Sequence, residues 1–128
     1  MATIIAYTTI DQSRKLAEIL PLESADMRYE YPSIEKDEIQ EPMNGFHTLS
    51  FNLFKEIDSF IYFPCWSLAA LLGVLPKGTR LLKSTNISSI GDVKYHCECP
   101  KANIDKWFDN AVDACVAMIE KLHELKML

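Results

Sequence analysis

Residues 60–75, FIYFPCWSLAALLGVL, form the most hydrophobic window of the chain and constrain its fold more than any other stretch. Thirteen of these sixteen residues are apolar, and the window has no polar face. A segment that is apolar on all sides belongs in a core or an interface. Pro64 suits the first turn of a helix, and Pro76 with Gly78 suits its end. We therefore expect a buried central helix that begins at Pro64.

The chain before this window predicts one helix and one strand. Thr9 and Gln12 have the spacing of a capping box, which indicates a helix over residues 10–20. Residues 25–31 alternate strictly between apolar and polar, which is typical of a strand with one wet face. Pro32 should end that strand.

Residues 47–58 fit two structures. Alternation over residues 48–54 favours a strand, whereas Leu49, Leu53 and Ile57 recur every four residues, as in a helix. The period alone does not choose between a strand and a helix here.

The second half of the chain predicts a hairpin and a final helix. Residues 79–85 and the alternating residues 93–99 should pair as two strands. Asp109 or Asn110 can cap a helix whose apolar positions recur at steps of three and four. Trp107 and Phe108, just before it, should plug the edge of the core.

These elements predict an α+β fold in a single domain over residues 1–128. The strands do not alternate one for one with helices, which favours an antiparallel sheet. We expect about four strands packed with about three helices, in the order helix, one or two strands, helix, hairpin, helix.

The charge balance bears on partners. The net charge is −5, whereas binding to nucleic acid phosphates requires a basic face. The second half does carry a basic group: Lys77, Arg80, Lys83, Lys94 and Lys101. An exposed hairpin commonly carries such residues, so we expect no nucleic acid partner. The apolar window is too short to span a bilayer, and the chain lacks cofactor motifs, so we expect neither a membrane nor a cofactor.

Residues 32–45 form a predicted acidic loop. Its carboxylates are Glu35, Asp37, Glu38 and Glu41. A long acidic loop is either simply solvated or functional, and docking of a protein partner is the function that these residues suit.

The four cysteines, Cys65, Cys97, Cys99 and Cys115, suggest two kinds of site. Cys97 and Cys99 share one face of a strand and are candidate metal ligands, although a role as small buried side chains in the core explains them more simply. Cys65 is a candidate nucleophile if His47, His96 or His123 lies beside it. The start of the chain lacks the pattern of a secretory leader, so we expect reduced thiols and a cytoplasmic protein.

Three sequence pieces carry a resemblance to a known group. They are Ser24 to Met27 (SADM), Pro64 to Leu72 (PCWSLAALL), and Val112 to Cys115 (VDAC). Together they resemble small uncharacterised proteins encoded by gut Bacteroidetes and their phages or integrated mobile elements. The resemblance implies an accessory protein in a bacterial or phage setting, and it assigns no activity.

We therefore expect a small cytoplasmic protein that acts by contact rather than catalysis and forms a homodimer, since homodimers commonly bury apolar patches. One alternative is a small-ligand binder or thiol-dependent enzyme with a pocket near Cys65 and Trp66. Another is an acidic inhibitor of a DNA-binding partner.

Overall fold

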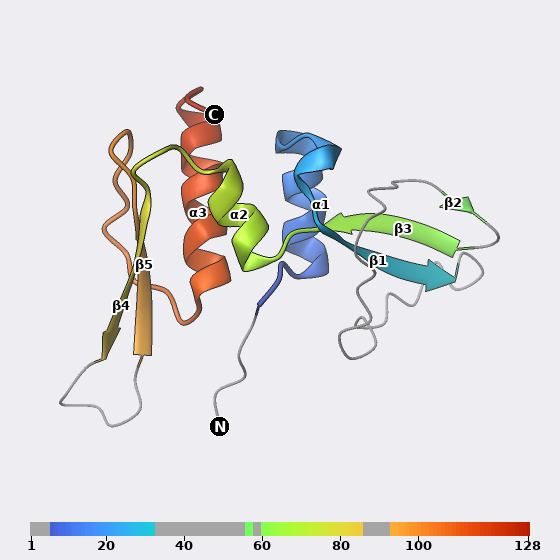
Figure 1. Cartoon of the computed structure of the whole chain (residues 1–128), viewed down its shortest axis with the longest axis horizontal. Coiled ribbons are helices and arrows are strands. Elements are labelled where there is room, and N and C mark those ends of the chain that lie inside the picture. The colour runs from blue at the N-terminus through green and yellow to red at the C-terminus, as the bar shows by residue number, and fades with distance from the viewer. Residues whose placement is uncertain (1–5, 33–55, 58–59, 86–92) are drawn as a thin grey trace.

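The computed structural model describes residues 6–32, 56–57, 60–85 and 93–128, which fold into a mixed arrangement of helices and strands (Figure 1). The elements in chain order are α1 (Ile10–Ile19), a 3₁₀ turn (Leu22–Ser24), β1 (Met27–Pro32), β2 (Glu56–Ile57), β3 (Phe60–Cys65), α2 (Leu68–Val74), β4 (Arg80–Thr85), β5 (Val93–Glu98) and α3 (Ala111–Glu124). Within the described residues this agrees in part with the predicted order of helix, strands, helix, hairpin and helix, because three strands rather than one or two precede α2.

The strands form two separate sheets, so the prediction of one antiparallel sheet is wrong. One sheet has the order β1-β3-β2, and the other is the β4–β5 hairpin. All pairings are antiparallel, with Met27 opposite Cys65 in the first sheet and Arg80 opposite Glu98 in the second. Figure 1 shows the sheets at opposite ends of the molecule with the helices between them.

The capping box of α1 is confirmed. The Gln12 backbone N–H donates to Thr9 Oγ1 at 3.2 Å, and the Thr9 N–H donates to Gln12 Oε1 at 2.9 Å. These bonds satisfy two of the backbone donors that a helix start leaves open. The helix ends at Ile19, just before Pro21, as expected.

The prediction of a helix beginning at Pro64 is wrong. Pro64 and Cys65 are the last residues of β3, and α2 begins only at Leu68. A proline fits there because, among the described residues, β2 pairs with Phe60 and Ile61 and the rest of β3 pairs with β1 alone. The Ser67 hydroxyl then accepts the Ala70 N–H at 3.1 Å and caps the helix.

The core is built around α3 rather than α2. Eight residues of α3 are buried: Ala111, Val112, Ala114, Cys115, Val116, Met118, Ile119 and Leu122. The helix packs against β5, α2 and α1. On α2 only Leu71 is buried within the helix, so the expectation of a helix dry on all sides is wrong.

The hairpin is confirmed, and the segment before α3 attaches it to the core. Tyr95 and Phe108 exchange two backbone hydrogen bonds, of 2.8 and 2.7 Å. Phe108 packs against the core, as predicted. Trp107 is exposed, so the prediction that it also plugs the edge of the core is wrong. Among the described residues, no helix combines the length and the apolar character needed to cross a membrane.

Two predictions lie outside the described residues. One is the acidic loop after Pro32, with its four carboxylates. The other is the choice between strand and helix over residues 47–58, of which only Glu56–Ile57 are described, as β2.

Candidate functional site

Cys65 lies in a buried network of hydroxyl groups at the end of β3. The Thr8 hydroxyl is 3.6 Å from Cys65 Sγ, and Ser13 Oγ is 2.8 Å from the same Thr8 hydroxyl. The Tyr29 hydroxyl donates to the Thr8 carbonyl, which also accepts from Cys65 Sγ at 3.7 Å. The network therefore ties together the N-terminal segment, α1, β1 and β3.

Burial decides the chemistry of this thiol. Desolvation raises the pKa of Cys65, and the hydroxyls of Thr8, Tyr29 and Ser13 lower that pKa by less. The Cys65 thiol is hydrogen-bonded to Thr8. Neither of the described histidines, His96 and His123, is a hydrogen-bond partner of this thiol. The third histidine of the sequence prediction, His47, lies outside the described residues. The geometry favours a protonated thiol in a structural role.

Trp66 fills the space beside Cys65. The indole Nε1 donates to Ser24 Oγ at 2.9 Å, and the Trp66 backbone N–H donates to Thr8 Oγ1 at 3.1 Å. Both Cys65 and Trp66 are fully buried. One hollow of about 440 Å³ lies elsewhere, between α1 and β3, and is lined by Arg14, Ala17, Glu18, Leu22 and Phe63. Arg14 covers its aromatic wall, with the guanidinium carbon 5.3 Å from the Phe63 ring centroid.

Cys97 and Cys99 both lie on the buried side of the hairpin. Cys97 and Cys115 of α3 belong to the same buried core cluster, and their interaction lowers the pKa of Cys97 and raises that of Cys115. Within 6–32, 56–57, 60–85 and 93–128, no three side chains of His, Cys, Asp or Glu gather in the way a metal ion requires. The two predicted ligands, Cys97 and Cys99, thus lie on one side of the hairpin, and Cys115 belongs to the same core cluster.

His96 takes part in a different contact. Its ring stacks on Trp107 with the centroids 5.1 Å apart, and Nδ1 lies 3.0 Å from the Lys106 carbonyl oxygen. The histidine therefore anchors the segment that precedes α3.

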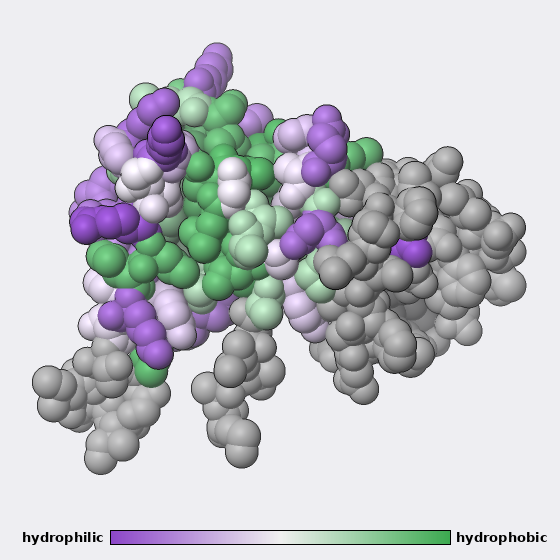
Figure 2. All heavy atoms as spheres, viewed as in Figure 1, coloured by the Kyte–Doolittle hydropathy of each residue, from purple (hydrophilic) through white to green (hydrophobic). Residues whose placement is uncertain are grey.

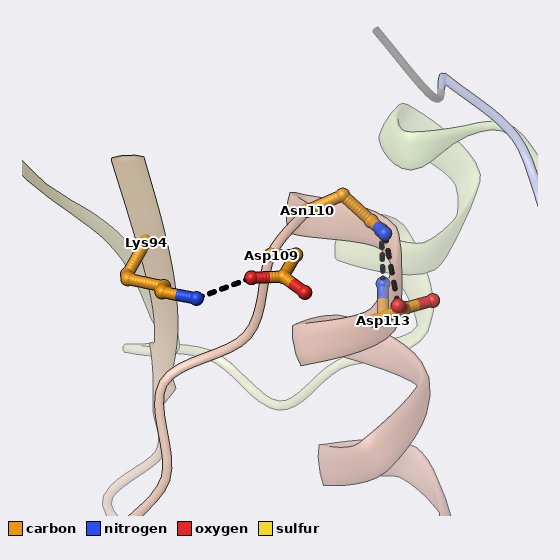
Figure 3. Close-up of polar contacts among 4 residues, drawn as sticks. All are labelled: Lys94, Asp109, Asn110 and Asp113. Atoms are coloured by element: carbon orange, nitrogen blue, oxygen red, sulfur yellow. Dashed lines mark hydrogen bonds and ion pairs between the residues drawn. The ribbon is translucent and has the colours of Figure 1, made fainter. Parts of the chain in front are cut away.

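The basic group of the hairpin is partly neutralised. Arg80 pairs with Glu98 at 2.8 Å. Lys94 pairs with Asp109 beside the start of α3, where Asn110 accepts the Asp113 N–H at 2.8 Å (Figure 3). The neighbouring ammonium lowers the pKa of the Asp109 carboxyl. These pairs reduce the positive charge that the hairpin could offer to phosphate groups.

The surface feature that the sequence prediction missed is apolar. Among the residues whose burial the structure describes, five large hydrophobic side chains are between 38% and 48% exposed: Leu72, Trp107, Leu125, Met127 and Leu128. Around Leu72, the small residues Ala69 and Gly73 are also exposed. Figure 2 shows hydrophobic residues gathered on the face where α2 lies in Figure 1. The positions 69, 72 and 73 signal one helix face, but an all-apolar segment does not reveal which side faces solvent.

No family model, curated protein or solved structure matches this chain. The resemblance described above therefore stays a prediction, and the candidate sites rest on the chain's own geometry.

Proposed function

We propose that this protein acts by binding protein chains, and that its first partner is a second copy of itself. The observation that carries the proposal is the exposed apolar face of α2. We define this face by Ala69, Leu72 and Gly73, which are spaced three and four residues apart and so lie on one side of the helix.

The shape of this face suits helix-to-helix contact. A Cβ atom built on Gly73 would meet nothing within 4 Å, so the space above the helix is open. Small residues allow a second backbone to approach closely, and Leu72 supplies apolar area to bury. A symmetric dimer brings the same patch together from both copies, so each Leu72 would pack over the Ala69 and Gly73 of the other chain.

The cysteine geometry supports contact rather than catalysis. A nucleophilic thiol needs a low pKa and a base, whereas burial raises the pKa of Cys65 and its hydrogen bonds are to Thr8. The alternative of a thiol-dependent enzyme near Cys65 and Trp66 therefore gains no support from these contacts.

The wider setting is proposed from the sequence alone. The resemblance to proteins of gut Bacteroidetes and their phages suggests a cytoplasmic accessory protein. The carboxylates Glu35, Asp37, Glu38 and Glu41 stay a predicted surface for a further protein partner, including a DNA-binding one.

Sedimentation equilibrium tests the proposal. We expect the wild-type chain to have the mass of a dimer that does not change with concentration over the working range. Leu72→Lys places a charge in the proposed interface and should yield a monomer, whereas Leu125→Lys, at a leucine of similar exposure after α3, should stay dimeric. A wild-type monomer at high concentration would overturn the proposal.

A further inference from the structure

We propose that the hollow between α1 and β3 binds a free α-amino acid that has a large apolar side chain. The hollow has a volume of about 440 Å³, which lies within the range of small-molecule sites. Its described lining residues come from α1, the 3₁₀ turn and β3, and not from α2. The inference therefore does not depend on the self-association proposed above.

A small residue on α1 leaves room for the hollow. Arg14, Ala17 and Glu18 are spaced three and four residues apart, so they lie on one face of the helix, and the helix packs on β3. Because Ala17 carries only a methyl group, space remains between this face and Phe63 on the strand. Leu22, just after the helix, adds a further apolar wall.

The walls of the hollow are held in place by contacts outside it. The capping box fixes the start of α1. The Leu22 carbonyl accepts the Ala25 N–H at 3.0 Å within the 3₁₀ turn. Phe63 lies opposite Tyr29 in the antiparallel pairing of β1 with β3. Because these walls are already ordered, a ligand that enters the hollow immobilises few additional groups of the protein.

Arg14 can bind an anion at the rim of the hollow. Its guanidinium carbon lies 5.3 Å from the Phe63 ring centroid, so the aromatic ring holds the cation over this wall. Among the described residues, no hydrogen bond or ion pair engages the Arg14 N–H groups. These donors have the geometry that binds a carboxylate through two parallel hydrogen bonds.

Glu18 supplies the opposite charge one turn further along α1. Residues four apart on a helix have Cβ atoms about 5–6 Å from each other, and an arginine before a glutamate is the less favourable order for a pair. In the part of the chain that the structure describes, no ion pair joins Arg14 to Glu18. A molecule with a carboxylate and an ammonium group on one carbon can bind both: Arg14 donates to the carboxylate, and the ammonium donates to Glu18.

The apolar walls define the third group of the ligand. Ala17, Leu22 and Phe63 have side chains that neither donate nor accept hydrogen bonds. A large apolar side chain is stabilised between them because it loses contact with water, whereas a small or polar side chain gains little. Charge and apolar surface together therefore favour amino acids such as phenylalanine.

NMR titration of the ¹⁵N-labelled full-length protein with L-phenylalanine tests the proposal. We expect saturable shifts of backbone amides in α1, at Leu22 and at Phe63, with a dissociation constant of about 1 mM or tighter. Three related compounds each lack one group: 3-phenylpropionate lacks the ammonium, 2-phenylethylamine lacks the carboxylate, and L-serine lacks the apolar side chain. Each should bind at least about tenfold more weakly than L-phenylalanine.

Variants with matched controls test the two charged residues. Arg14→Gln and Glu18→Gln should each weaken the binding of L-phenylalanine by about tenfold or more, because each removes a charged partner of the ligand. Lys15→Gln and Glu23→Gln remove one positive and one negative charge from exposed positions that are not among the described lining residues. Both control variants should bind L-phenylalanine as the wild type does.

The result can be separated from that of the self-association test. Leu72→Lys, designed to disrupt the proposed dimer, should bind L-phenylalanine with the affinity of the wild type, because Leu72 does not line the hollow. The absence of saturable shifts at about 10 mM L-phenylalanine would overturn the proposal. Equal binding of 3-phenylpropionate or 2-phenylethylamine, or equal losses in the rim and control variants, would also overturn it.

Discussion

Gln12 Nε2 donates a hydrogen bond to Asp113 Oδ1 at 2.7 Å and joins the first turn of α1 to the first turn of α3. The two residues are 101 positions apart in the sequence. The same Gln12 side chain closes the capping box with Thr9, and Asp113 also accepts from Asn110 Nδ2 at 2.9 Å. One amide therefore serves both a local helix start and the packing of two distant helices.

Replacing this amide should destabilise the fold. We expect Gln12→Ala to lower the free energy of unfolding by about 1–2 kcal/mol, because it removes a cap partner and a bond to a carboxylate. Urea unfolding measures the change. Glu18→Ala, at an exposed position on the same helix, is the matched control and should change stability by less than about 0.5 kcal/mol. Equal effects of the two substitutions would show that the contact is not stabilising.

The central role of α3 predicts a large effect at Ile119, which is fully buried. Ile119→Ala should cost about 2–5 kcal/mol, because it removes buried methyl groups and leaves a cavity. Leu125→Ala, just after the helix and 43% exposed, should cost far less. A loss at Ile119 no greater than that at Leu125 would argue against a core centred on α3.

The buried thiol of Cys65 predicts a stability that falls at alkaline pH. Its pKa is raised in the fold from the ordinary value of 9.0, so above pH 9 the unfolded chain loses the proton while the folded chain keeps it. The contribution is fully present below pH 9 and declines by about 1.4 kcal/mol per pH unit as pH rises towards the folded-state pKa.

Urea unfolding on either side of pH 9 measures this dependence. Cys65→Ala should show a shallower alkaline decline than the wild type and a parallel curve at lower pH. Identical slopes above pH 9 would mean that the folded and unfolded chains release this proton together.

Local signals in the sequence predicted much of the fold. The capping box at Thr9, the alternation over residues 93–99 and a helix cap at Asp109 or Asn110 each depend on neighbouring residues, so each is visible without tertiary information. Of the two possible caps, the structure uses Asn110. The β4–β5 hairpin and α3 follow from these signals alone.

The failures concern relations between distant segments. Pro64 suits either a helix start or a strand without a second neighbour at that position, and the second holds because β2, in the part of the chain that the structure describes, pairs with two residues at the other end of β3. The separation into two sheets likewise depends on packing between distant elements, because α3 packs on β5 whereas α1 packs on β3. The core cluster brings together Cys97 from a strand and Cys115 from a helix, and no spacing within the sequence marks this.

The open space above Gly73 provides the most direct test of self-association through α2. Gly73→Leu should preserve or raise the stability of the single chain, because leucine favours helix more than glycine by up to about 1 kcal/mol and no atom of the described residues lies within 4 Å of the added Cβ. The same side chain would hold a second helix away. Sedimentation equilibrium of the wild type and Gly73→Leu at matched concentrations therefore tests self-association directly. We expect the wild type to be a dimer and Gly73→Leu to be a folded monomer. A wild-type monomer, or dimers of equal stability for both chains, would contradict self-association through α2.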